Sequence, residues 1–578
     1  MIDLFKYTKG YRLLTFLTPL LVICEVVLEV IIPSLMGNIV NSGIVGRDLP
    51  FIRHQSVLMV ACAVFSLIFG VAAGLTSAKA ATGFTRNLRV AIFDRIQLFS
   101  FGSIDRFKQG GLVTRLTTDA FFVQVAFQNI IRIGIRLPIM LISALIMSMR
   151  INRSLAGIYL IALPVLVVCL AVISAIAMPK FRKAFDQIDV LNSSTQENLH
   201  GIKVVKSFAR EGFEKKKFDS VVTSLYRKLV GAEKTMALTN PTMRTVAYSC
   251  LIVIALFASK RIAGGEMQAG HLMALYIYNF QILFSMMMFA MIISIVIMCS
   301  TCYGRIKEVL HENLDIANCD NPLTNVADGS IEFRNVDFSF EGNKDKLALK
   351  DVSISIGSGQ RIGITGPTGS GKSALVGLIA RLYDVTVGSV SVGGNDVRDY
   401  DLKVLRDSVS VVLQKNNLFS GTLRSSLSWG KSDASDKEIW DALKIAQASD
   451  FVLALPGKLD YEVAQQGGNF SGGQRQRLCI ARALLKSPKI LIMDDSFSAL
   501  DTATDERLRK SLHNDRPELT KIIIAHKVLS IMDCDKIVVM KEGHVENIGT
   551  HEELLSKSEF YRDLYESQLK SNEVEGLR

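Results

Sequence analysis

The segment Gly366–Ser373 carries the residue types that bind phosphate. It reads Gly-Pro-Thr-Gly-Ser-Gly-Lys-Ser, which fits the pattern G-x-x-x-x-G-K-[S/T]. Glycines let successive backbone N–H groups wrap phosphate oxygens, and the N-terminus of a following helix adds positive potential. The loop residues are Gly366, Pro367, Thr368, Gly369, Ser370 and Gly371. We expect Lys372 to reach the β- and γ-phosphates of a nucleotide and the Ser373 hydroxyl to hold Mg²⁺.

The flanks of this loop, and a second strand, supply the context that the loop needs. Arg361–Thr365 has the composition of a strand, and an apolar helical stripe follows the loop, made of Ala374, Leu375, Leu378, Ile379 and Leu382. Lys489–Met493 is a second buried-strand run, and it ends in Asp494 and Asp495. An Asp at the end of such a strand, beside a phosphate loop, is the expected partner of Mg²⁺. This predicts Asp494 as a metal ligand together with Ser373.

Residues 470–474, Phe-Ser-Gly-Gly-Gln, open a helix that runs to about Lys486. Ser471 suits the N-cap, and Gly472 and Gly473 permit close backbone approach. This is a second helix N-terminus built for an anion. Since the first loop already holds the phosphates of one nucleotide, the second site indicates a nucleotide held by another subunit.

These motifs, in this order, closely resemble those of the ATP-binding cassette (ABC) superfamily, and the whole chain resembles an exporter half-transporter. The resemblance implies a membrane α-helical bundle with six transmembrane helices of exporter type, fused to an α/β P-loop ATP-binding cassette domain. It implies ATP and Mg²⁺ as cofactors. It also implies that the signature segment, Ser471, Gly472, Gly473 and Gln474, closes over ATP bound to a partner cassette.

The same resemblance assigns roles to further residues. Phe340 matches the aromatic residue that stacks on adenine. Gln414 matches the glutamine that contacts Mg²⁺ and links to the membrane domain, and His526 matches the switch histidine near the γ-phosphate. Asp495 occupies the place of the catalytic base, and residues 498–501 match a loop that contacts the partner cassette.

Six apolar stretches are long enough to span a bilayer, which takes about 20 residues of helix. They run approximately over Leu14–Leu35, Val57–Ala80, Ile130–Met149, Leu155–Ala177, Thr245–Ile262 and Leu272–Cys299. The connections over residues 81–129 and 178–244 are long and rich in helix formers, so paired arms could project on the order of 30 Å beyond the bilayer. By resemblance, Gly111–Asp119 and Gly201–Ala209 are the coupling segments at the tips of these arms.

Near residue 320 the sequence changes from long apolar runs to short strand-like runs that alternate with helices. This change predicts a membrane domain over 1–320 and a nucleotide-binding domain over 321–578. ATP is a cytosolic fuel, so this domain and, with six spans, both termini are expected on the cytoplasmic side of the cell membrane. The net charge is +11. Many Lys and Arg residues flank apolar spans, and no basic helix carries base-stacking aromatics, so no nucleic-acid partner is expected.

Asp495 departs from the family pattern, in which Glu usually polarises the attacking water. Asp is one methylene shorter, and a misplacement of about 1 Å can cost roughly 10²-fold in rate. This resembles one subunit of the heterodimeric bacterial multidrug exporters, which pair a weak and a strong ATP site. A harmless conservative exchange is the alternative. Gln465 also replaces a residue that is usually acidic, so contacts between cassette and arms there stay open.

Charged pairs lie inside two of the expected spans. Glu25 and Glu29 are four residues apart, as are Arg132 and Arg136, so each pair shares one helix face. Charges in a bilayer must face a cavity or one another. Internal ion pairing is preferred here over contact with substrate. The methionine cluster at positions 286–288 and 291 suits either a deformable ligand wall or lipid-facing packing.

The sequence therefore predicts the ATP-binding and permease subunit of an exporter of small amphipathic, multidrug-like compounds. Its partner is a second half-transporter, with a heterodimer favoured over a homodimer. Two alternatives remain open: a membrane-anchored ATP sensor that does not transport, and an importer or a lipid or peptide translocator with an exporter-like fold.

Overall fold

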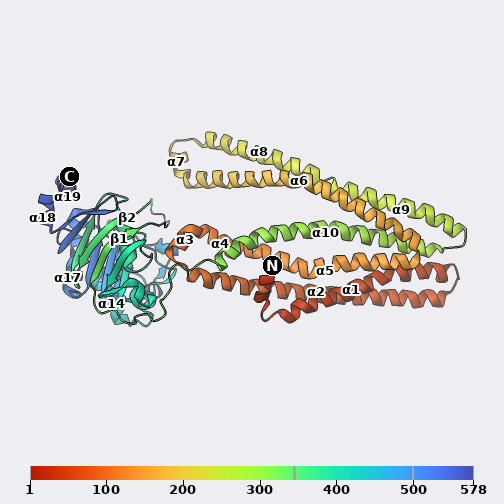
Figure 1. Cartoon of the computed structure of the whole chain (residues 1–578), viewed down its shortest axis with the longest axis horizontal. Helices are drawn as coiled ribbons and strands as arrows, with labels where there is room; N and C mark the ends of the chain where they lie inside the picture. Colours follow the sequence, from red (N-terminus) through yellow and green to blue (C-terminus); the bar gives the residue numbers. More distant parts are fainter. Residues whose placement is uncertain (1, 341, 343–345, 498–499, 577–578) are drawn as a thin grey trace. The chain divides into compact units, whose positions relative to one another are not determined.

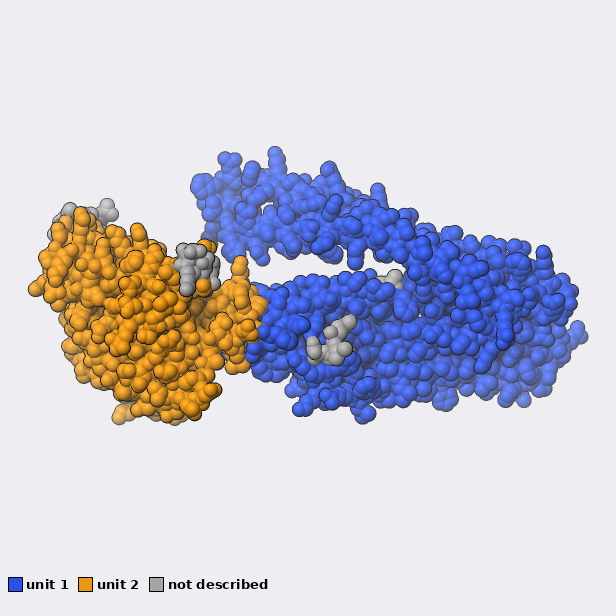
Figure 2. Space-filling model, viewed as in Figure 1, with its two compact units in different colours: residues 1–97, 110–311 blue, residues 98–109, 312–578 orange. Residues whose placement is uncertain are grey.

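The computed structural model describes residues 2–340, 342, 346–497 and 500–576. The chain forms two compact units. One comprises Met1–Gln97 and Gly110–His311, and the other comprises Leu98–Gln109 and Glu312–Arg578. Figure 2 colours them separately. The second unit therefore contains a short piece of the chain that follows the second span.

Long helices make up the first unit (Figure 1). In the part of the chain that the structure describes, six helical segments are long and apolar enough to cross a membrane, which confirms the predicted six spans. They are α1 (Arg12–Asn38), α2 (Leu49–Gln97), α5 (Ala120–Ile151), α6 (Arg153–His200), α9 (Thr239–Ala263) and α10 (Ala269–Leu310). The π-helix η2 (Ile39–Ile44) extends α1, while α4 (Gln109–Thr114) and the π-helix η3 (Arg115–Asp119) precede α5.

Two of these helices are much longer than a bilayer is thick. At 1.5 Å per residue, the 49 residues of α2 and the 48 of α6 each span about 70 Å, against a hydrocarbon core of about 30 Å. Helix α8 (Glu211–Met236) packs beside α6, and the short α7 (Ile202–Ser207) closes the turn between them (Figure 1). The predicted second tip, Gly201–Ala209, coincides with α7.

Buried side chains lock the helices of this unit together. Val22, Val26 and Val30 of α1 belong to one apolar cluster with Tyr159 and Tyr278. Both phenols are satisfied inside the bundle. Tyr278 donates to the Val30 carbonyl at 2.8 Å, and Tyr159 donates to the Leu275 carbonyl at 2.9 Å. Buried polar groups of this kind fix helix register because an unpaired phenol would be costly.

Two larger sheets build the second unit. The six-stranded sheet has the order β12-β11-β3-β10-β9-β6. Its strands are β3 (Arg361–Thr365), β6 (Val409–Val412), β9 (Ile490–Asp494), β10 (Thr520–Ile524), β11 (Lys536–Lys541) and β12 (His544–Gly549). All neighbours are parallel except β11 and β12. An antiparallel sheet, β2-β1-β4-β5, holds β1 (Ile331–Phe338), β2 (Leu349–Ile356), β4 (Val387–Val392) and β5 (Asn395–Asp396), and β7 (Gly421–Thr422) pairs with β8 (Glu462–Val463).

Helices alternate with the strands of the second unit. They are α11 (Lys372–Ile379), α12 (Leu402–Ser408), α13 (Leu423–Leu427), α14 (Asp436–Ile445), α15 (Ser449–Leu453), α16 (Gly472–Leu485), α17 (Thr502–Asp515), α18 (His551–Lys557) and α19 (Glu559–Gly576). Alternating strands and helices of this kind cover both faces of a parallel sheet.

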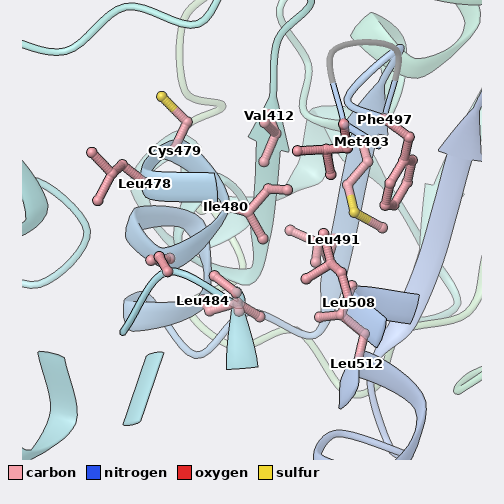
Figure 3. Close-up of a cluster of buried hydrophobic side chains, with 14 of the residues drawn as sticks. Val412, Leu478, Cys479, Ile480, Leu484, Leu491, Met493, Phe497, Leu508 and Leu512 are labelled. Carbon is pink, nitrogen blue, oxygen red and sulfur yellow. The ribbon is translucent and has the colours of Figure 1, made fainter. Parts of the chain in front are cut away.

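Strand β9 is buried along its whole length, with a separate apolar cluster on each of its faces. Leu491 and Met493 belong to the cluster that also contains Ile480 of α16 and Leu508 of α17 (Figure 3). Ile490 and Ile492 belong to the second cluster. A strand that is buried on both faces, as parallel strands usually are, gives a rigid platform for whatever follows its end.

Candidate active site

Four predicted site segments leave the sheet at one edge. Strands β3, β10, β9 and β6 are parallel neighbours, and Ile364 lies opposite Ile524, Ile524 opposite Asp494, and Met493 opposite Val412. Their carboxyl ends therefore meet. The phosphate loop follows β3, and His526 follows β10. Asp494 ends β9, Asp495 follows it, and Gln414 follows β6. Ligands of open parallel sheets bind at this edge.

The phosphate loop has a backbone that excludes most side chains. Gly366 has φ +148°, and a Cβ there would lie 2.1 Å from the carbonyl oxygen of Met540. Gly371 has φ +95°, and its Cβ would lie 2.6 Å from the Ala348 carbonyl oxygen. Pro367, Thr368 and Gly369 form an exposed crest, and Ser370 is buried behind it. At Gly366 and Gly371, therefore, the backbone carries no side chain that would keep a ligand away.

Lys372 begins helix α11 and folds back over the loop. Its Nζ donates to the carbonyls of Gly366 at 2.9 Å and Pro367 at 2.8 Å. The side chain is largely buried, and this burial lowers the pKa of Lys372, while Asp494 and Asp495 oppose the shift. Two neutral carbonyls are weak partners for a buried ammonium. Phosphate oxygens would be stronger ones, so this site fits an anionic ligand.

Asp494 and Ser373 are brought together as the sequence predicted. The Ser373 hydroxyl donates a hydrogen bond to the Asp494 carboxylate, and burial raises the pKa of Asp494 in spite of this bond. Within the described ranges, no group of three or more His, Cys, Asp or Glu residues could hold a metal. A hydroxyl and a carboxylate suit Mg²⁺, which takes few protein ligands and completes its octahedron with phosphates and water.

Asp495 and Gln414 lie in contact across the site. Gln414 Nε2 donates to Asp495 Oδ2 at 3.5 Å, which is a long bond. The Asp495 backbone is left-handed, with φ +48°, and its N–H donates to the Ile524 carbonyl at 3.0 Å. Asp tolerates this conformation better than most residues. Gln476 Nε2 of α16 donates to the Asp495 carbonyl at 3.4 Å, so the acid is held from two elements.

Phe340 stands at the edge of the site and is 55% exposed. It makes edge contacts with Phe338 at 4.8 Å and with Tyr383 at 5.3 Å between ring centroids. An exposed aromatic ring supported from behind can stack on a base. The stacking role of Phe340 stays a prediction, and the exposure of its ring is compatible with it.

Tyr383 connects this aromatic group to the short helix α3 (Phe101–Phe107). Its phenol donates to Asp105 Oδ2 at 3.0 Å, and the rings of Phe101 and Tyr383 meet edge-on at 6.0 Å. Burial and the nearby Asp105 carboxylate raise the pKa of Tyr383 to about 12, so the phenol remains a donor at neutral pH. Neither Tyr383 nor Asp105 was predicted from the sequence.

The predicted first coupling segment, Gly111–Asp119, belongs to the first unit. It forms the end of α4 together with η3, and its charges pair with α10: Arg115 with Glu308, and Asp119 with Arg305. The short helix α3, which precedes it, belongs to the second unit, and the Ser100 hydroxyl caps the Ser103 N–H of that helix. The coupling role of Gly111–Asp119 stays a prediction.

The signature segment caps α16 as expected. The Ser471 hydroxyl accepts from the Gln474 N–H at 3.3 Å, and Gln474 Oε1 accepts from the Ser471 N–H at 3.0 Å. Ser471 and Gly472 are exposed, and Gly473 is half-buried. Of the predicted partner-contact loop, residues 498 and 499 lie outside the described residues, and Asp501 caps α17 through the Thr504 N–H.

Comparison with known proteins identifies the chain. Residues 15–287 match the family "ABC transporter transmembrane region", and residues 349–498 match the family "ABC transporter". An uncharacterized ABC transporter ATP-binding protein of Bacillus subtilis, YfiB, is 34% identical over 563 residues, covering 97% of this chain and 98% of that protein. The chain belongs to the ABC transporter family. Another uncharacterized member, Rv1273c of Mycobacterium tuberculosis, is 33% identical over 577 residues and 99% of both chains.

A solved structure confirms the fold of this ABC transporter. It is described as a bacterial Atm1-family ABC exporter with ATP bound, and it superposes with a TM-score of 0.81 at 23% identity, covering 98% of both chains. The predicted fold class, a six-helix membrane bundle of exporter type fused to an ATP-binding cassette, is therefore correct. The cassette family implies ATPase activity, and six spans make the ABC transporter a multi-pass membrane protein.

The charged residues of the spans are paired in this ABC transporter. Arg136 of α5 forms ion pairs with both Glu25 and Glu29 of α1, which confirms the preferred interpretation for these three. Arg132 lines the same open hollow of about 630 Å³, whose lining residues come from α1, α2 and α5. Glu25 Oε2 is buried and has no hydrogen-bond partner in the described part of the chain. A Cβ on Gly70 of α2 would lie 2.9 Å from Glu25 Oε1.

Proposed function

We propose that this chain is the ATP-binding and permease subunit of an exporter, which couples ATP binding and hydrolysis to the export of small amphipathic compounds. The membrane is the cell membrane, with the cassette and both termini in the cytoplasm. One observation carries the proposal: α3, which follows the second span, is held within the unit that contains the phosphate loop. Tyr383 binds it through Asp105, and Glu312 binds it through Ser103 at 2.9 Å and through Arg106.

The site residues act as follows in this proposal. Phe340 stacks on adenine, and Lys372 exchanges its carbonyl partners for phosphate oxygens. Asp494, Ser373 and Gln414 hold Mg²⁺, which neutralises phosphate charge when bound. Asp495 orients the attacking water, and His526 faces the γ-phosphate. Because Gln414 contacts Asp495, movement of either side chain changes the position of the other.

A second half-transporter is the proposed partner. The exposed signature segment faces ATP on the partner cassette, so bound ATP holds the two cassettes together.

Apolar side chains that are exposed outside the spans also indicate a partner that buries them. Phe208, beside α7, is 73% exposed, and Phe419 and Trp429 are 50% and 67% exposed and stack at 4.2 Å. We propose that the α7 tip of each subunit packs on the Phe419–Trp429 pair of the other.

A heterodimer is favoured because Asp495 is short. One ATP site then combines this chain's Lys372, Asp494 and Asp495 with the partner's signature segment, and it turns over slowly. The other site combines the partner's phosphate loop and carboxylate with Ser471–Gln474, and it performs most of the hydrolysis. Two sites of unequal speed follow from one missing methylene, since a shift of about 1 Å can cost roughly 10²-fold in rate.

Two variants test this arrangement through steady-state ATPase of the purified complex. Asp495→Asn is expected to change total ATPase little. Ser471→Arg is expected to abolish most of it, although Ser471 serves a nucleotide on the other chain. If Asp495→Asn removes nearly all activity and the protein purifies as a dimer of one chain, the sites are equal, and Asp495 is the base of a homodimer.

A membrane-anchored ATP sensor is the second candidate, and Asp495 favours it because a slow site suits sensing. Transport decides between the two. An amphipathic fluorescent dye is expected to accumulate in sealed inside-out vesicles when ATP is added outside, and not with Lys372→Ala. ATPase activity without dye movement would favour the ATP-sensor hypothesis. Dye movement out of these vesicles would indicate an importer.

The hollow that α1, α2 and α5 line is a proposed contact for substrate through Arg132 and its apolar side chains, since Glu25, Glu29 and Arg136 pair with one another. Its lining combines Glu25, Glu29, Arg132 and Arg136 with apolar side chains of α2, such as Leu67 and Val71. Both kinds of surface suit an amphipathic compound. The methionines of α10 are a second candidate wall: Met286 is partly buried against neighbouring helices, and Met291 is half exposed.

A further inference from the structure

Gln568 of α19 binds the backbone on both sides of Lys527. Its Nε2 donates to the His526 carbonyl at 2.9 Å, and its Oε1 accepts from the Val528 N–H at 2.8 Å. One planar amide therefore restrains two peptide groups that flank a single residue. Because the His526 carbonyl belongs to the residue whose imidazole is proposed to face the γ-phosphate, this contact limits how that residue can rotate.

The segment that Gln568 binds is anchored at both of its ends. On one side, Ala525 is buried, and its N–H donates to the Ile364 carbonyl at 3.1 Å. On the other side, Val528 is fully buried, and the Ser530 hydroxyl donates to Asp505 Oδ2 at 2.8 Å. His526 and Lys527 are both exposed between these anchors. Gln568 thus binds the short stretch that the sheet and the core leave unsupported.

Helix α19 is itself held firmly enough to act as a support. Tyr561 is fully buried, and its hydroxyl lies 2.8 Å from His551 Nδ1. Leu564 and Tyr565 pack against the apolar cluster to which Val528 also belongs. The helix and the segment after His526 therefore share one core, so the amide of Gln568 is delivered from a fixed position.

We infer that Gln568 is a positioning residue for hydrolysis: it holds the His526 segment in the orientation that the γ-phosphate requires. The C-terminal helix α19 is thereby part of the ATP-hydrolysing machinery. This inference rests on the proposed function, in which His526 serves the ATP bound to this chain's own phosphate loop.

The test uses the full-length transporter and isolates this chain's own ATP site. In a heterodimer, Ser471→Arg silences the other site, so single-turnover hydrolysis of γ-labelled ATP in that background reports on Lys372, Asp495 and His526. In a homodimer the wild-type background serves. Gln568→Met keeps the length of the side chain and removes both hydrogen bonds. Glu566→Ala, at an exposed position of the same helix, is the matched control.

Gln568→Met is expected to slow hydrolysis roughly tenfold, as the loss of two neutral hydrogen bonds implies. ATP affinity should stay within about twofold, since the variant removes an interaction that matters at the chemical step. Gln568→Glu keeps the acceptor for Val528 and loses the donor to His526, so its rate should be intermediate. Glu566→Ala should match the parent, and thermal unfolding should show that every variant is folded.

The decisive measurement repeats Gln568→Met with His526→Ala. A residue that acts through His526 has nothing left to position in that background, so the further loss should be less than about twofold. A full tenfold loss there would show that Gln568 supports the fold and not the histidine, and would overturn the inference. An unchanged rate for Gln568→Met beside an inactive His526→Ala would overturn it as well. If His526→Ala itself hydrolyses ATP normally, the role proposed for His526 fails first, and the inference fails with it.

Discussion

Tyr383→Phe tests whether the bond between Tyr383 and Asp105 couples the cassette to the membrane helices. The change removes one hydroxyl and keeps the ring that contacts Phe101, Phe338 and Phe340. A hydrogen bond to a charged acceptor is worth about 1.5–3 kcal/mol when buried. Asp105 is exposed, so we take about 1 kcal/mol, which is roughly a fivefold change in the equilibrium constant for docking of α3.

The expected result is a loss of coupling with chemistry preserved. ATP affinity and basal ATPase should stay close to those of the wild type, because Tyr383→Phe leaves Phe340 supported. The ratio of dye transported to ATP hydrolysed should fall by at most about fivefold, because the docked fraction of α3 cannot change by more than its equilibrium constant does. Parallel measurements of dye uptake and phosphate release in proteoliposomes give this ratio directly.

Tyr400→Phe is the matched control. Tyr400 is fully buried in the same unit, and its hydroxyl donates to the Val392 carbonyl at 2.8 Å, away from α3. It should lower the melting temperature and leave the transport ratio unchanged. If Tyr383→Phe couples normally, or if Tyr400→Phe uncouples equally, then the phenol does not transmit motion and the reasoning from this contact is wrong.

Three further predictions concern the ATP site and the charged cavity. Lys372→Ala should weaken ATP binding at this chain's site by roughly ten- to a hundredfold, as for the loss of a charge-assisted bond; photolabelling measures it, and normal labelling would refute the phosphate-loop assignment. Burial raises the pKa of Asp494, so its charge costs folding free energy above that pKa and costs none below the ordinary value. Asp494→Asn should therefore raise the melting temperature without nucleotide at pH 7, lose this advantage as the pH falls from the raised pKa to the ordinary value, and show no stabilisation by Mg²⁺-ATP. Arg136→Gln should destabilise the transporter by on the order of 2 kcal/mol, because Glu25 and Glu29 then face each other unpaired; combining it with Glu25→Gln and Glu29→Gln should restore the melting temperature, and a single variant as stable as the wild type would contradict the pairing.

The sequence predicted those parts of the site that depend on local backbone chemistry. Gly366 and Gly371 are in the loop because their conformations and close contacts exclude a Cβ, so the spacing of the glycines, together with the flanking strand and helix, predicts the phosphate site. Ser471 likewise caps α16 through its immediate neighbours. The six spans follow from apolar length, which lipid imposes on any crossing helix. In each case the physical cause lies within a few residues of the signal.

Contacts between distant segments left no such signal. Asp105 and Tyr383 are 278 residues apart, and Gln568 is 42 residues beyond His526. A lone Tyr, Asp or Gln fits many surface positions, and only the tertiary structure selects its partner. The partners of Arg115 and Asp119 were not predicted for the same reason: both lie on α10, far along the chain.

Two contacts that the sequence did not predict support different residues of the proposed nucleotide site. Tyr383 supports Phe340, where adenine is proposed to stack, and it binds α3. Gln568 supports the His526 segment, where the γ-phosphate is proposed to lie, and it belongs to α19. Hydrolysis changes the γ-phosphate and leaves adenine in place. The contact at α3 should therefore persist while any nucleotide is bound. The orientation held by Gln568, in contrast, matters only while the γ-phosphate remains. Nucleotide binding would thus hold the membrane helices, and hydrolysis would reset them.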